Sequence, residues 1–240
     1  MITDERKFEF EHAIRRAIPR DLFVDVKAQF PLAAEQADAA VRHSHKAVTN
    51  GVPLSRVRES KAVGLVRHQL LDEVFEQALL RHGGQAIKSV LVELNPDEMK
   101  AAPIHLTTGL FGDTLIGFAS HRELEDTPVK NATRRALCHQ NRGLAPDLFH
   151  GLEMFNDRQR FVLIMVRRDP AILGKIASMT VSIADSRGEV FLYQAGIEDF
   201  LAGYGATSSA APMGKRPPKL RTVSGTFKKG KTEKADADEK

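Results

Sequence analysis

The sequence has only one cysteine, Cys138, so an intramolecular disulfide is excluded. Long apolar runs are also missing, because the longest, FVLIMV at 161–166, is far below the roughly 20 residues that a membrane-spanning helix needs. The N-terminal stretch MITDERKFEFEH is charged where a secretory signal peptide would have an apolar core. Together these absences predict a cytoplasmic protein with no membrane partner.

Motifs for cofactor binding and catalysis are missing as well. The glycines lack the spacing of a phosphate-binding loop or a dinucleotide-binding turn, so we expect no nucleotide cofactor. No glycine elbow flanks a nucleophile, and on a helix Cys138 and His139 would point about 100° apart. The nine histidines lack the spacing of a metal site. We therefore expect no catalytic residue, no cofactor and no bound metal.

What the chain has is an uneven distribution of charge. Its 240 residues carry a net charge of +4, yet residues 214–240 alone hold nine basic and four acidic side chains, a net of +5. The preceding part has 26 basic and 27 acidic side chains, a net of −1. The basic character therefore belongs to the C-terminal segment, which is rich in small residues and proline and has little apolar surface to bury. We expect residues 205–240 to form a disordered basic tail.

Seven basic residues of this tail follow one another without an intervening acid. Such a segment can neutralise the phosphates of DNA or RNA, with counterion release giving a salt-sensitive affinity. A solvated tail and contact with an acidic protein partner are the alternatives. The seven residues are Lys215, Arg216, Lys219, Arg221, Lys228, Lys229 and Lys231.

Apolar spacing predicts a helical N-terminal third. Helical periodicity covers 4–18 and ends at Pro19, and the ambiguous stretch 21–30 favours a helix. Pro31 is expected to open a separate alanine-rich helix, and the widest apolar stripe predicts a long helix over 54–81, ended by Gly83-Gly84.

Strand patterns follow. They cover 87–94, a hairpin of 104–108 with 114–119, a continuous apolar strand at 160–167 and a hairpin of 175–185 with 189–194. In the last hairpin Ala177, Met179, Val181 and Ile183 are expected inward, and Ser178, Thr180 and Ser182 outward. A helix over 129–141 lies between the strands, and a short one closes the chain at 197–204.

These elements predict an α+β protein: a helical N-terminal third packed on a mostly antiparallel sheet with one inserted helix. We expect a single domain over 1–204, with a helical part at 1–83 and a sheet part at 84–204, followed by the tail.

The long helix carries a second basic patch, formed by Arg56, Arg58, Lys61 and Arg67 in its first half. Its second half is acidic, so the charges run against the helix dipole, which favours acids at the start and bases at the end. A broken local rule of this kind marks a candidate binding surface. The arginine pairs Arg134-Arg135 and Arg167-Arg168 could also grip phosphate, but with a nearly neutral body we interpret them as solvated surface charge.

The leading hypothesis is a non-enzymatic binding or regulatory protein that contacts nucleic acid through the tail, with the helix patch as a secondary site. A protein–protein interaction scaffold is one alternative. The other is a divergent metal-dependent nuclease, because the order helix, three strands, helix, strand resembles the core of restriction-endonuclease-like nucleases. Glu93, Asp97 and Asp113 would then be its carboxylates. The strand at 114–120 lacks the expected acid and lysine, so this hypothesis comes second.

Overall fold

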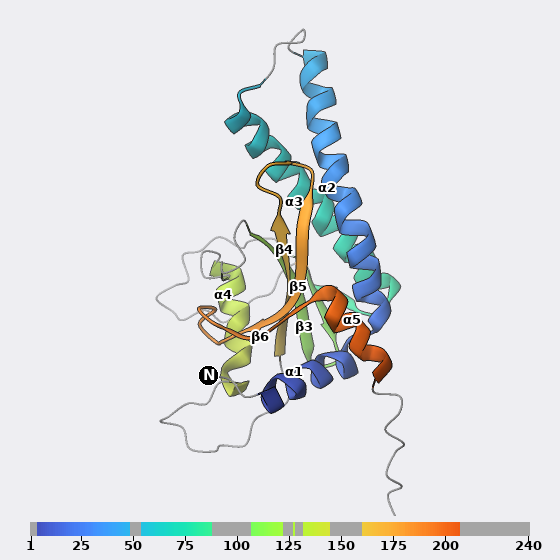
Figure 1. The fold of residues 1–240 in the computed structure, drawn as a ribbon, viewed down its shortest axis with the longest axis vertical. Coiled ribbons are helices and arrows are strands. Elements are labelled where there is room, and N and C mark those ends of the chain that lie inside the picture. Colours follow the sequence, from blue (N-terminus) through green and yellow to red (C-terminus); the bar gives the residue numbers. More distant parts are fainter. Residues whose placement is uncertain are drawn as a thin grey trace, which may run out of the picture. The chain divides into compact units, whose positions relative to one another are not determined.

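The computed structural model describes residues 4–48, 54–87, 107–121, 127, 132–144 and 160–206. The described helices are α1 (Asp4–Ala17), α2 (Arg20–Val48), α3 (Arg56–Arg81), α4 (Ala132–Cys138), the 3-10 helix η3 (His139–Leu144) and α5 (Ile197–Ala206). The described strands are β1 (Gln85–Ile87), β2 (Thr108–Phe111), β3 (Thr114–His121), β4 (Arg160–Arg168), β5 (Ile176–Ala184) and β6 (Phe191–Gly196). This arrangement confirms the predicted α+β class (Figure 1).

The six strands form one sheet in the order β1-β2-β3-β4-β5-β6, so each strand lies beside its neighbours in the chain. Every pair is antiparallel except β3 and β4, which run parallel over 114–121 and 160–167. Parallel neighbours need a crossover connection, and α4 with η3 lies on that connection. The inserted helix therefore brings the ends of β3 and β4 together at one end of the sheet.

Apolar side chains cover both faces of the sheet, which gives two cores. Val162, Ile164 and Val166 of β4 face the larger core with α1, α2, α3 and α5, while the alternating Phe161, Leu163 and Met165 face the smaller core beneath α4. Figure 1 shows α2 and α3 on one side of the strands and α4 on the other. The continuous apolar run of this strand was correctly read as burial on both faces.

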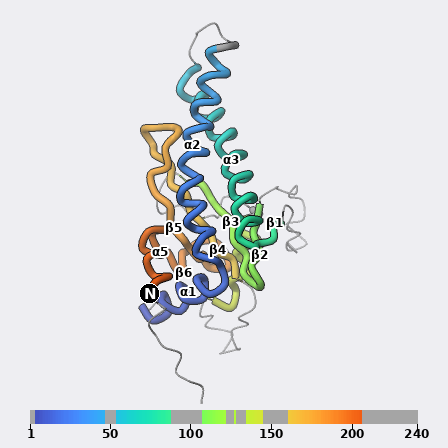
Figure 2. The backbone as a smooth tube through the Cα atoms, turned by 90° about the vertical axis from the view of Figure 1, so that its right-hand side faces the viewer, coloured from blue at the N-terminus to red at the C-terminus, as the bar shows by residue number. Residues whose placement is uncertain are grey.

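One predicted helix boundary is wrong. Pro31 does not open a new helix but lies inside α2, which continues unbroken from Arg20 to Val48 beside α3 (Figure 2). Proline removes one helical hydrogen bond, which costs about 3 kcal/mol in a helix interior. Phe30, Ala33 and Ala34 next to it are fully or almost fully buried, and this packing offsets the cost.

The ends of the other helices lie closer to those predicted from the sequence. Helix α3 ends as predicted at the glycine pair: Gly83 adopts a positive φ of 80°, and the Gly84 amide donates to the Leu79 carbonyl at 2.8 Å. Helix α4 is shorter than expected, because from His139 the chain tightens into the 3-10 helix η3.

The hairpin of β5 and β6 was predicted correctly, and Met179, Val181 and Ile183 of β5 face the larger core as expected, but Ala177 does not. The other hairpin was predicted with the wrong first strand: it is β2, so residues 109–111, which were expected in the turn, pair with β3. The pairing of β4 with β5 shifts between Arg167 and Arg168, which are opposite Ser178 and Ile176. This bulge turns Ile176 toward the larger core and leaves Ala177 exposed. Ser182 is fully buried because the second face of the sheet is covered too.

Candidate anion-binding site

Three of the four residues of the predicted helix patch line one cavity. Arg56, Lys61 and Arg67 of α3 meet Arg168, at the end of β4, around a cavity of about 550 Å³ that we call the outer groove. Arg58 is exposed on the same helix and is not among the residues that line it. The described residues that line it are Arg56, Val57, Ser60, Lys61, Val63, Arg67, Arg168, Asp169, Pro170 and Leu173.

A second cavity of about 290 Å³ adjoins the first and shares Arg67 and Arg168 with it. We call it the inner pocket. It collects three arginines from three elements: one from α3, one from α4 and one from β4. The described residues that line it are Gly64, Arg67, His68, Leu71, Ser120, Arg134 and Arg168. None of these residues is acidic.

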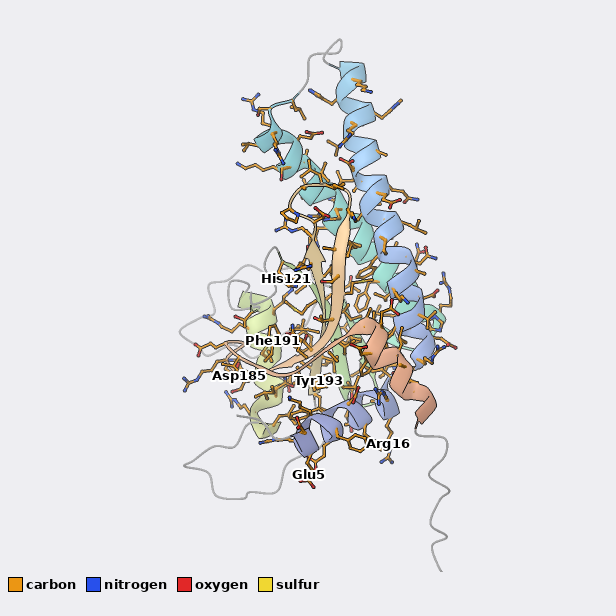
Figure 3. All side chains as sticks on the ribbon, in the orientation of Figure 1. Glu5, Arg16, His121, Asp185, Phe191 and Tyr193 are labelled. Carbon is orange, nitrogen blue, oxygen red and sulfur yellow. The ribbon has the colours of Figure 1, made fainter. Side chains whose placement is uncertain are left out.

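The parallel strand pair explains where the inner pocket lies. Ser120 and His121 end β3 beside Arg167 and its neighbour Arg168, the last residue of β4. Figure 3 labels His121, which marks this end of the sheet. In sheets with parallel strands, ligands bind outside the carboxyl ends of the strands, where the connections diverge. Here α3 covers the face to which Ser120 and Arg168 point, since both line the pocket with α3 residues.

Arg67 is the most deeply placed of the arginines, with only 6% of its surface exposed. Its Nη1 donates to the Leu173 carbonyl at 3.1 Å, which ties α3 to the loop after β4. Burial, together with the charge of Arg168, lowers the pKa of Arg67 to about 10. The side chain therefore remains a cation at neutral pH.

Arg134 reaches the pocket beside β3. Among the described residues the pairing of β2 with β3 ends at Ile116, and the carbonyl of Phe118 accepts a hydrogen bond from Arg134 Nε at 3.1 Å. Burial lowers its pKa to about 10, against an opposing effect of Asp72. This guanidinium is thus anchored by its backbone contact and is still charged at pH 7.

Two donors at this site have no hydrogen-bond partner in the part of the chain that the structure describes. They are Nε of Arg168 and the hydroxyl of Ser120, and both atoms are buried. A buried donor without a partner costs about 1–3 kcal/mol, more when it is charged. Such donors are therefore expected to meet a bound water or a ligand.

His68 completes the pocket beside the arginines. Its ring keeps part of its surface in solvent but packs edge-on against Phe118, with ring centroids 5.7 Å apart. Partial burial lowers its pKa below the usual 6.5, Arg134 and Arg67 add to this, and Asp72 opposes it. His68 is therefore mainly neutral at pH 7 in the absence of an anion.

The carboxylates near the cavities already have partners. Asp72 accepts hydrogen bonds from the Thr107 amide at 3.1 Å and the Thr107 hydroxyl at 2.8 Å. Asp169 accepts from the amides of Ala171 and Ile172 at 2.8 and 3.1 Å, which lowers the pKa of its carboxyl group. Asp72 is therefore engaged by Thr107, and Asp169 by the backbone of the turn after β4.

Other predicted site residues are not brought to these cavities. Asp113 lies exposed in the turn between β2 and β3, and Glu93 and Asp97 fall outside the described residues. Within the described part, no three His, Cys, Asp or Glu side chains are arranged to hold a metal ion, and no helix is long and apolar enough to cross a bilayer. The seven tail residues Lys215, Arg216, Lys219, Arg221, Lys228, Lys229 and Lys231 also lie outside the described residues.

The comparisons with known proteins are negative. No family model, curated protein or solved structure matches this chain. The function is therefore argued from the geometry of the two cavities.

Sequence reasoning missed half of this site. Arg134 and Arg168 were interpreted as solvated surface charge, but both are partly buried and line the inner pocket. His68 and Ser120 carried no signal of their own. The signal that could have located them was the helix between two apolar strands, which predicts a parallel pair and places the residues ending those strands side by side.

Proposed function

We propose that this protein binds nucleic acid, holding phosphates of the backbone in the outer groove. The observation that supports the proposal is the convergence of Arg56, Lys61 and Arg67 with Arg168 around one cavity. Three of these residues belong to the patch predicted from the charge order of the helix. The fourth comes from a strand end roughly a hundred residues later in the chain.

The chemistry of the groove suits a polyanion. Guanidinium groups match phosphate oxygens in pairs, and the lysine adds a compact positive charge. Asp169, the one acid among the described residues of the lining, has its Oδ1 engaged by two backbone amides. None of the described lining residues is aromatic and could stack on a base, so we expect contacts to the backbone and little dependence on sequence.

The basic tail is the second part of the proposal. Its seven cations would add further phosphate contacts on the same polymer, and two weak sites on one chain strengthen each other through their effective concentration. The proposed function is therefore that of a binding or regulatory protein, without a chemical step.

The test is a salt titration of binding to single- and double-stranded DNA and RNA, followed by fluorescence anisotropy. The double variant Arg56→Gln/Lys61→Gln should weaken binding at least about tenfold and lower the slope of log K against log salt by about two. Arg58→Gln is the matched control, because it removes one positive charge from the same helix outside the groove.

Equal losses in the Arg58→Gln control and the double variant would show that the groove has no special role. Salt-insensitive binding, or no binding to any of the four polymers, would refute the proposal. A parallel series with magnesium tests the nuclease hypothesis, since cleavage that requires the ion would make the protein an enzyme.

A further inference from the structure

We infer that the inner pocket is a binding site for a phosphate monoester, such as the terminal phosphate of a nucleic acid strand or a small phosphorylated molecule. The pocket lies beside the outer groove and is lined by a different set of side chains. The inference rests on the proposed function only for the question of which molecule carries the phosphate.

The first support is charge. Arg67, Arg134 and Arg168 come from three elements and line one cavity, and none of the described residues that line it is acidic. Arg67 and Arg134 keep their protons at pH 7, since their pKa values are about 10. Like charges in a partly buried cavity repel one another, and a multiply charged anion bound between them would reduce this repulsion.

The second support is a pair of hydrogen-bond donors in residues that line the cavity. The Ser120 hydroxyl and Nε of Arg168 are buried without a hydrogen-bond partner among the described residues. Both residues line the inner pocket together with Arg67. Hydroxyl and guanidinium donors grouped in this way satisfy several oxygens of one tetrahedral anion.

The third support is the reason why the pocket should bind a phosphate monoester more tightly than a phosphodiester of a nucleic acid backbone. A phosphate monoester carries close to two negative charges at pH 7 and presents three terminal oxygens, whereas a diester carries one charge and presents two. Three guanidiniums therefore favour the monoester. Because Arg67 and Arg168 belong to both cavities, a terminal phosphate in the inner pocket leaves the rest of the molecule beside the outer groove.

Two probes test the inference on the full chain. Inorganic phosphate, titrated calorimetrically against chloride at constant ionic strength, should bind to the wild type. An oligonucleotide with a 5′- or 3′-terminal phosphate should bind at least about tenfold more tightly than the same oligonucleotide with hydroxyl ends, by the gain of charge-assisted hydrogen bonds.

The variants Arg134→Gln and Ser120→Ala should remove or reduce that preference, while Arg56→Gln, which alters only the outer groove, should weaken both oligonucleotides equally. Ser120→Ala keeps the test valid if Arg134→Gln disturbs the fold through its bond to Phe118, and far-UV circular dichroism monitors both. Equal affinity for phosphorylated and hydroxyl ends, with no binding of inorganic phosphate, would overturn the inference and leave the groove proposal standing. Binding of inorganic phosphate without binding of any oligonucleotide would refute the proposed function and assign the pocket to a small phosphorylated molecule.

Discussion

At the scale of single residues, the question is how the arginines of the inner pocket are held in place. Arg67 and Arg134 each donate a hydrogen bond to a backbone carbonyl, of Leu173 and Phe118. A neutral acceptor fixes the position of a guanidinium without cancelling its charge. These two contacts therefore hold the arginines in place as cations.

The lowered pKa of His68 should be visible in the pH dependence of the free energy of unfolding. Burial, Arg134 and Arg67 lower its pKa in the folded state, and Asp72 opposes them. The unfolded state therefore binds more protons between the lowered pKa and 6.5, so the free energy of unfolding should rise with pH across that window. In phosphate-free buffer, urea denaturation between pH 5 and 8 should show a steeper rise for the wild type than for His68→Gln. Parallel curves for the two proteins would show that the pKa of His68 is not lowered in the folded state.

At the scale of elements, the sequence predicted periodic segments well and their relations poorly. The hairpin of β5 and β6 and the buried central strand follow from local apolar spacing. The continuity of α2 through Pro31 does not, because it depends on packing between residues distant in the chain. The same applies to Arg168, which meets residues of α3 and α4 only in the folded protein.

The prediction at the scale of elements concerns the stability of α2 and the effect of Pro31 within it. Pro31→Ala restores a backbone donor inside α2 and should raise the free energy of unfolding by about 1–3 kcal/mol, less the entropy that the unfolded chain regains. Urea denaturation measures this directly. Leu32→Ala is the matched control, since Leu32 is exposed and adjacent, and it should change stability little. A loss of stability in Pro31→Ala would mean that the packing of α2 requires the geometry imposed by proline.

At the scale of the whole molecule, the two cores and the excess positive charge lie in different parts of the chain. Residues Met1–Thr207 form one compact unit that contains both cores and both cavities, whereas the excess positive charge lies after Gly214. Composition revealed this division directly. The inner pocket was not predicted, because its arginines converge only once α4 joins β3 to β4 in a parallel pair, and this pairing was not inferred from the helix between the two strands.

The division predicts the behaviour of a chain that ends at Thr207. Because it retains both cores, its melting temperature should stay within about 2 °C of the full chain, measured by calorimetry. Its affinity for DNA and RNA should fall. The slope of log K against log salt should become less steep by several units, since each lost phosphate contact reduces its magnitude by about 0.9 in B-DNA. Its preference for a phosphorylated end should persist, because that preference belongs to the inner pocket. An unchanged salt slope would assign all phosphate contacts to the body, and a large drop in melting temperature would mean that residues after 207 take part in the fold.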